Sequence, residues 1–197
     1  MRKHDMRSYP RSIRCEGGEI ELRPMTAADS DTMLDFVRGL PMHDLLFLPR
    51  DISQPKVLAA WLQANERGAM STLLAILDAT VVGCATVAID ALSWSPHVGE
   101  LRIVVAQEMR RKGLGRALTQ ECFALALALG LEKLTGQMTV DQRGAIAVFE
   151  GLGFRGEALL RNHVKDSAGV THDIVILGHD VAKFQSQREA YGVPDAL

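Results

Sequence analysis

Residues 104–118, VVAQEMRRKGLGRAL, decide the fold and the chemistry of this chain. An apolar run passes through a turn with Gly113 and Gly115 into a segment of helical composition. The first N–H groups of a helix have no partner within it, and the helix dipole adds positive character there. The segment also carries four cationic side chains, those of Arg110, Arg111, Lys112 and Arg116. We expect a strand, turn and helix that bind a phosphate-bearing ligand; a solvated basic turn is the alternative.

Two common phosphate-binding loops do not fit these residues. A P-loop requires Lys followed by Ser or Thr after its second Gly, and no such pair stands at that spacing. A dinucleotide fingerprint requires a third Gly where this chain has Leu118. The remaining pattern is R-x-x-G-x-G after a strand.

The apolar pattern predicts one α+β domain with a mixed, seven-stranded sheet and about four helices. The expected order is strand, two helices, three strands, helix, strand, helix and a final hairpin. Helix starts are indicated at residues 26–29 and 53–55, and Asp141 is expected to cap the last helix. We expect a flexible arm over residues 1–17, the domain over 18–184 and a tail over 185–197.

Composition limits the classes of partner. Twenty-two basic and 24 acidic residues give a net charge of −2, and aromatic residues make up 5%, so neither nucleic acid nor a membrane surface is expected as a partner. The longest apolar stretch, residues 122–131, is too short to span a bilayer, and no secretion signal is present, which favours a cytoplasmic protein.

Neither the cysteines nor the histidines predict a metal site. The three cysteines, Cys15, Cys84 and Cys122, are far apart and are expected to be reduced. His172 and His179 are seven residues apart on one predicted strand, so they would lie on opposite faces.

Two motifs resemble a known family. Residues 105–115 are similar to V-x-P-x-x-R-x-x-G-x-G of the GNAT superfamily of N-acetyltransferases, with Gln107 in place of Pro. Residues 142–154, QRGAIAVFEGLGF, are similar to that family's N-x-x-A-x-x-x-Y-x-x-x-G-F at Ala145, Gly153 and Phe154. The resemblance covers about residues 18–180, and the last hairpin more loosely resembles the ribosomal-protein N-terminal acetyltransferases.

The resemblance implies acetyl-CoA as the cofactor. Its pantetheine would lie between two parallel strands that splay apart, residues 101–106 and 133–140, the fourth and fifth of the seven. A main-chain N–H near Val105 would polarise the acyl carbonyl. The implied cofactor-binding residues are Val104, Val105, Arg110, Arg111, Lys112, Gly113, Leu114, Gly115, Arg116, Gln142 and Phe149.

An amine attacks only after losing a proton, so a base or a water path is needed. Glu100 stands roughly where histone-type members of the superfamily have a catalytic glutamate, although it could instead pair with Arg102 or be solvated. His97 is a second candidate, because imidazole titrates near neutral pH. A surface-loop histidine without a catalytic role is its alternative.

The chain also departs from the family pattern. Phe149 replaces the tyrosine that protonates the departing thiolate, and Gln142 replaces an asparagine. A non-catalytic acyl-CoA-binding module is therefore the alternative to an enzyme. The acceptor is a small amine or a protein amino terminus, and a homodimer is possible by analogy. The residues expected around the acceptor are Asp44, Arg50, Asp51, Trp94, His97, Arg161 and His163.

Overall fold

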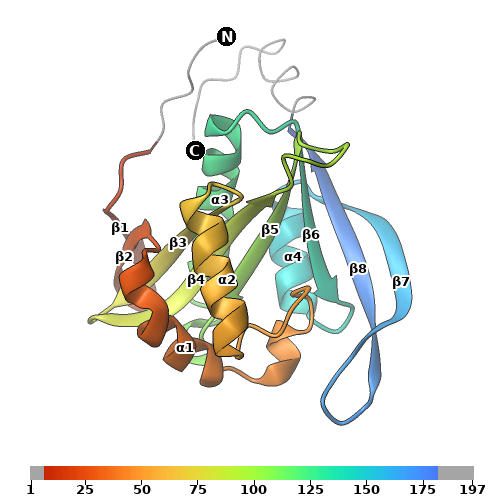
Figure 1. Ribbon diagram of the computed structural model, residues 1–197, viewed down its shortest axis with the longest axis horizontal. Helices are drawn as coiled ribbons and strands as arrows, with labels where there is room; N and C mark the ends of the chain where they lie inside the picture. Colours follow the sequence, from red (N-terminus) through yellow and green to blue (C-terminus); the bar gives the residue numbers. More distant parts are fainter. Residues whose placement is uncertain (1–6, 182–197) are drawn as a thin grey trace.

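The computed structural model describes residues 7–181, which form one mixed sheet flanked by helices (Figure 1). The sheet has eight strands in the order β1-β2-β3-β4-β5-β6-β8-β7. The strands are β1 Arg11–Cys15, β2 Gly18–Pro24, β3 Met70–Leu77, β4 Thr80–Ile89, β5 Val98–Val105, β6 Lys133–Thr139, β7 Arg155–Lys165 and β8 Thr171–Asp180. The helices are α1 Ser30–Arg38, α2 Pro55–Glu66, α3 Leu114–Ala128 and α4 Arg143–Gly151, with 3-10 turns η1 Ala27–Asp29, η2 Met42–Leu45 and η3 Gln107–Met109.

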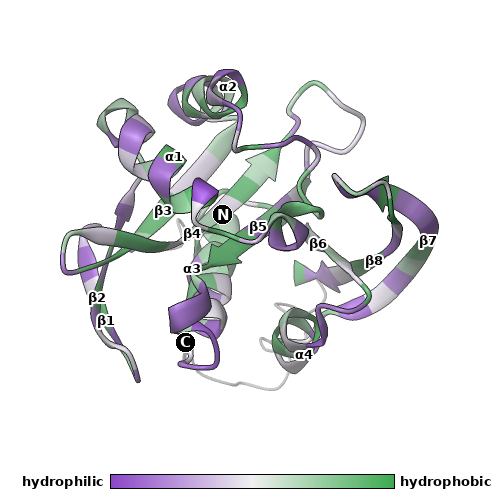
Figure 2. Ribbon diagram, turned by 90° about the horizontal axis from the view of Figure 1, so that it is seen from below, coloured by the Kyte–Doolittle hydropathy of each residue, from purple (hydrophilic) through white to green (hydrophobic). Residues whose placement is uncertain are grey.

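Helices cover both faces of the sheet. α1 and α2 lie on one face, and α3 and α4 lie on the other (Figure 2). The strands between them alternate their side chains between two apolar cores. In β5, Leu101 belongs to the core that includes Leu118 of α3, whereas Val104 belongs to the core that includes Trp61 of α2. Among residues 7–181 no helix is both long enough and apolar enough to cross a bilayer.

Local signals in the sequence place α1 and α2 as expected. Thr26 and Asp29 form a reciprocal capping box at η1, and the Asp29 carboxylate also receives two hydrogen bonds from Arg23. Asp51 accepts hydrogen bonds from the backbone and side chain of Ser53, just before Pro55 opens α2. α1 thus follows directly on a capped 3-10 turn, and α2 begins at a proline, which has no N–H group to satisfy.

The expectation of a flexible arm over residues 1–17 is wrong for residues 11–15. These residues form β1, which pairs antiparallel with β2 and raises the strand count from seven to eight. A buried carboxylate on α3, that of Glu121, holds this segment: it accepts hydrogen bonds from Arg7 and from the Tyr9 hydroxyl. The predicted tail, residues 185–197, lies outside the described residues.

β5 and β6 form a fork, as predicted for the fourth and fifth strands of seven. They pair in parallel from Val98↔Lys133 to Leu101↔Gly136, and the pairing ends there. β5 nevertheless stays paired with β4 as far as Val105, and β6 stays paired with β8 as far as Thr139. A gap therefore opens between β5 and β6 on the carboxyl side of Leu101 and Gly136.

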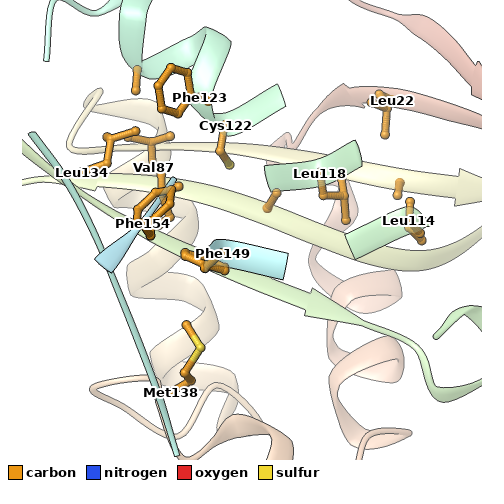
Figure 3. Packing of buried hydrophobic residues seen from close by; sticks show 14 of the residues in the cluster. Leu22, Val87, Leu114, Leu118, Cys122, Phe123, Leu134, Met138, Phe149 and Phe154 are labelled. Carbon is orange, nitrogen blue, oxygen red and sulfur yellow. The ribbon is translucent and has the colours of Figure 1, made fainter. Parts of the chain in front are cut away.

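Phe149 of α4 packs against the point where the fork begins. Its ring lies so close to Gly136 that a Cβ on that residue would overlap it. The ring is buried beside Phe154, with the two ring centroids 4.8 Å apart (Figure 3). A glycine at the last paired position of β6 thus makes room for an aromatic ring directly beneath the gap.

Candidate acyl-CoA and acceptor site

Backbone groups of β5 face the gap. The Ala106 N–H donates to the Val82 carbonyl of β4, at 2.9 Å. Successive N–H groups of a strand point to opposite edges, so the Val105 N–H points toward β6. In the described part of the chain the β5–β6 pairing stops at Leu101, and Val105 therefore has no partner strand on that edge. A linear ligand with its own amides could hydrogen-bond there as an added strand does.

The basic turn follows at the carboxyl end of β5. Two of its residues have left-handed backbone conformations, Arg111 with φ 59° and Gly113 with φ 87°. Gly113 stands immediately before α3, and a Cβ built on it would have no atom within 4 Å. The turn therefore presents the first N–H groups of a 15-residue helix to an open space, which suits an anion such as a pyrophosphate.

The cationic side chains of this turn differ in their surroundings. Arg110 forms an ion pair with Asp44 of η2, so its charge is directed to η2 and away from the start of α3. Arg111 and Arg116 are exposed, and Lys112 is half-buried. Arg116 extends from α3 toward Gly151, the last residue of α4.

The apolar and glycine residues of the turn leave their backbone groups accessible, because their side chains are buried or absent. The side chain of Leu114 is buried in the core between the sheet and α3, and Val104 is buried on the opposite face. Gly115 lies near Val105 at the end of β5. The main chain at these positions is thus available to a ligand, while the side chains of Leu114 and Val104 are buried in the cores on opposite faces of the sheet.

The second motif, residues 142–154, includes the residue before α4 and the whole of that helix. Gln142 is the residue before the helix, and its carbonyl accepts a hydrogen bond from the Ile146 N–H. Asp141 does not cap this helix as expected, because its carboxylate is paired with His43 of η2. Phe149 carries no hydroxyl group and serves as the buried ring beneath the gap.

Glu100 and His97 are placed very differently. Glu100 shares the α1/α2 face with Val104, and its two carboxylate oxygens accept hydrogen bonds from Arg102, at 3.0 and 2.9 Å. His97 precedes β5 at the closed end of the fork, where its carbonyl accepts hydrogen bonds from Glu132 and Lys133. At about 3.3 Å per residue, His97 is roughly 13 Å along the strand from Leu101, where the gap begins. The structure thus places Glu100 on the α1/α2 face, one residue before the gap opens, and leaves His97 at the closed end of the fork.

The residues expected around the acceptor are also divided. Asp44 lies at the mouth of the fork, where it pairs with Arg110. Asp51 is engaged in starting α2, and its pKa is lowered chiefly by the Ser53 hydroxyl. Trp94 is fully exposed in the loop before β5, at the same end as His97. Arg161 and His163 are exposed on the edge strand β7, and Arg50 is exposed after η2.

Sequence reasoning missed a cluster at the mouth of the fork. The His43 imidazole contacts Asp141 and Thr139, which lie at the end of β6, and its ring meets the ring of His172 on β8. These contacts join residues about a hundred positions apart in the sequence, and no local pattern marks them. His179, seven residues further along β8 than His172, lies on the other face, as its spacing predicts, against Phe123 and Phe154.

The sequence matches a known family. The sequence profile of the Acetyltransferase (GNAT) family matches residues 40–154, more than half of the chain. The chain belongs to this family. None of the curated protein sequences compared with it shows significant similarity.

Solved structures of GNAT acetyltransferases share the fold. A ribosomal-protein-alanine N-acetyltransferase from Brucella melitensis is 22% identical, with a TM-score of 0.68 over 81% of this chain and 98% of that one. RimJ from Mycobacterium smegmatis, in complex with CoA-disulfide, is 19% identical, with a TM-score of 0.70 over 93% and 96%. The yncA protein from Salmonella typhimurium, with its cofactor acetyl-CoA, is 17% identical, with a TM-score of 0.70 over 82% and 94%.

Proposed function

We propose that this GNAT protein transfers an acetyl group from acetyl-CoA to a primary amine, with both substrates bound together. The observation that carries the proposal is the fork between β5 and β6, with the Val105 N–H directed into it and the left-handed turn at Gly113 beyond it. Membership of the acetyltransferase family supports the reaction type. Simultaneous binding lets proximity lower the barrier without a covalent enzyme intermediate.

In this proposal the Gly113 turn and the end of β5 bind different parts of acetyl-CoA. The turn around Gly113, with the N–H groups that begin α3, holds the pyrophosphate, and Arg111, Lys112 and Arg116 add charge near it. The Val105 N–H donates to the acyl carbonyl oxygen and stabilises the negative charge that develops on it. Acetyl-CoA itself supplies the activated thioester.

Phe149 sets a limit on how the thiol leaves. A phenyl ring has no proton to give, so the sulfur departs as a thiolate unless another group or water protonates it. A thiol of pKa about 8.5 leaves tolerably as its anion. We assign Phe149 the role of supporting the pantetheine from below, consistent with its burial against Gly136 and Phe154.

The acceptor approaches from the α1/α2 face, which carries Glu100, Arg102 and η2. One of the similar structures, the ribosomal-protein-alanine N-acetyltransferase from Brucella melitensis, favours including a peptide with an amino-terminal alanine among the acceptors tested. We therefore propose trialanine as a peptide probe and phenethylamine as a small-amine probe.

Thermal unfolding tests cofactor binding first. Acetyl-CoA at about 100 times its dissociation constant adds roughly 2.7 kcal/mol of stability, which raises the midpoint of a domain this size by roughly 5–10 °C. Adenosine 3′,5′-bisphosphate serves as the comparison, and a smaller shift is expected because it does not reach the gap. An absent shift with acetyl-CoA would contradict the assignment of the Gly113 turn.

Release of free thiol then tests transfer. Release that depends on trialanine or phenethylamine supports the enzyme. Tight binding of acetyl-CoA without such release supports the alternative, a non-catalytic acyl-CoA-binding module.

A further inference from the structure

The His43 imidazole is held by a carboxylate on one side and by a second histidine on another. Its Nε2 lies 2.7 Å from Oδ2 of Asp141 and 3.4 Å from Oγ1 of Thr139. The ring of His172 meets it edge to face, with the centroids 5.0 Å apart, and Asp166 is 3.0 Å from His172 Nε2. The function proposed above uses none of these contacts.

The position of His43 is set by the two arms of the fork. Thr139 is the last residue of β6, and Asp141 follows it. The next residue of η2, Asp44, pairs with Arg110, which follows β5. Adjacent residues of one 3-10 turn are thus tied to the ends of the two diverging strands. In Figure 1, η2 is the orange segment beside the arrowhead of β6. His43 therefore stands at the open end of the gap, on the face from which the acceptor approaches.

We propose that His43 is the general base that takes the proton from the attacking amine, and that Asp141 positions it. This inference rests on the proposed function. The neutral amine nitrogen forms a bond to the thioester carbonyl carbon, the carbonyl electron pair moves to the oxygen, and the resulting ammonium proton passes to His43. The electron pair then returns, the C–S bond breaks and CoA leaves as a thiolate. The proton on His43 passes to solvent, which protonates the thiolate, so that amide and free thiol are the net products.

The contact with Asp141 determines which nitrogen accepts the proton. A carboxylate beside Nε2 favours the neutral tautomer with the proton on Nε2, which leaves the lone pair on Nδ1. Burial raises the pKa of Asp141, but hydrogen bonds from Thr139 and the backbone and the contact with His43 outweigh it, so the pKa stays below its ordinary range. Asp141 is thus ionised at neutral pH and stabilises the imidazolium that forms.

The other charged groups near His43 are accounted for. His172 faces its ring from β8 and is itself paired with Asp166, and Asp44 is paired with Arg110. Each carboxylate oxygen of Glu100 accepts a hydrogen bond from Arg102, so this carboxylate is directed to the guanidinium on its own strand. Of these described residues around the fork, His43 alone combines a titratable nitrogen, a carboxylate that orients it and a place at the mouth of the gap.

The rate should fall on the acid side, because only the neutral imidazole accepts a proton. In a base of this kind the rate rises with pH as the imidazole loses its proton and then levels off. Protonation of the amine substrate also lowers the rate at acid pH. The change in this acid limb between the starting protein and a His43 variant, measured with the same amine, therefore separates a catalytic role for His43 from a purely structural one.

The experiment compares the full chain with His43→Gln, Asp141→Asn and, as a matched control, His172→Gln. Steady-state release of thiol from acetyl-CoA is measured across pH with trialanine and phenethylamine, alongside the dissociation constant for acetyl-CoA and the unfolding midpoint. In His43→Gln the new side-chain amide can still donate to Asp141 but cannot titrate. We expect kcat to fall about 10²–10⁴-fold in His43→Gln, with the acid limb lost and acetyl-CoA affinity within about twofold of the starting protein.

Asp141→Asn removes the charge that favours the imidazolium, so its acid limb should move to lower pH, with a smaller loss of kcat. His172→Gln should keep the acid limb. The proposal is overturned if His43→Gln retains both kcat and the acid limb of the pH profile. It is also overturned if the acid limb is lost in His172→Gln alone. A starting protein that binds acetyl-CoA but releases no amine-dependent thiol contradicts the proposed function itself, which is a distinct result.

Discussion

At the scale of single residues, Gly113 illustrates why the turn before α3 needs glycine. Its φ of 87° is one that other residues adopt only at a cost of roughly 1–2 kcal/mol, and there is open space where a Cβ would project. In the proposed complex the side chain is absent where the pyrophosphate approaches the backbone. Neighbouring atoms do not require glycine here, whereas the backbone conformation does.

Gly113→Ala should therefore weaken acetyl-CoA binding at least about tenfold, equivalent to about 1.4 kcal/mol, in addition to its cost in stability. The matched control is Gly68→Ala, because Gly68 is also left-handed, with φ 74° and open space around it, but lies after α2. Calorimetric titration should show the loss of affinity in the first variant alone. Equal affinities in the two variants would mean that the turn does not hold the cofactor.

Gly136 is constrained by packing instead. A Cβ at this position would overlap the Phe149 ring at the start of the fork. Gly136→Ala should lower the free energy of unfolding by about 1–3 kcal/mol, the usual cost of overpacking. Gly144→Ala in α4 adds the same atom to open space and should be neutral or stabilising by up to about 1 kcal/mol. Urea denaturation gives the unfolding midpoint of each variant. Coinciding midpoints would show that the fork tolerates the added methyl group.

At the scale of elements, β1 is held in place by α3. The Glu121 carboxylate is buried, and it receives hydrogen bonds from Arg7 and Tyr9 and an ion pair from Arg11. Burial and this carboxylate together raise the pKa of Tyr9 well above its usual range, so the phenol stays a hydrogen-bond donor. One buried acidic side chain of α3 thus attaches the amino-terminal segment, in addition to the pairing of β1 with β2.

Glu121→Gln should cost about 1–3 kcal/mol, because it removes hydrogen bonds to a charged group. Amide hydrogen exchange should accelerate in residues 11–15 while the exchange of β4 stays slow. Glu66→Gln, the same change at an exposed position at the end of α2, provides the comparison. Unchanged exchange of β1 in Glu121→Gln would show that strand pairing with β2 alone holds it.

Some helices and strands could be predicted from local sequence signals, and others could not. The helix starts at Thr26 and Pro55 and the turn into α3 follow from local signals, and the structure has them there. β1 could not be predicted, because RSIRC has only two apolar residues and its anchor, Glu121, lies more than a hundred positions away.

The cluster around His43 could not be predicted for the same reason. Asp141 precedes a helix, which locally predicts a cap, whereas its partner His43 comes from another part of the chain. The turn that we propose to bind the pyrophosphate is a continuous segment and can be recognised in the sequence. The proposed acceptor side is assembled from η2, β6 and β8, and its residues meet only in the folded sheet.

At the scale of the whole molecule, the fork predicts which backbone amides a bound ligand will protect from hydrogen exchange. The Val105 N–H faces the gap, while Val104, its neighbour, is paired with Cys84 of β4. Binding of acetyl-CoA should slow hydrogen exchange at the Val105 amide by at least about tenfold relative to Val104, because a new hydrogen bond forms on that edge. Residue-resolved exchange by NMR gives both amides in one sample. Equal protection at both positions would indicate that the ligand stabilises the fold without lying in the gap.

The short seam between β5 and β6 has a consequence for engineering. Four residue pairs join two antiparallel blocks, β1 to β5 and β6 with β8 and β7, and residues 129–132 carry the chain from α3 to the second block. A chain cut within residues 129–132 would yield two fragments, each with its own antiparallel ladder, that must reassociate along this seam. A ligand bound in the fork would touch both fragments and favour their reassembly. The fold thus provides the layout of a split reporter whose complementation responds to acyl-CoA.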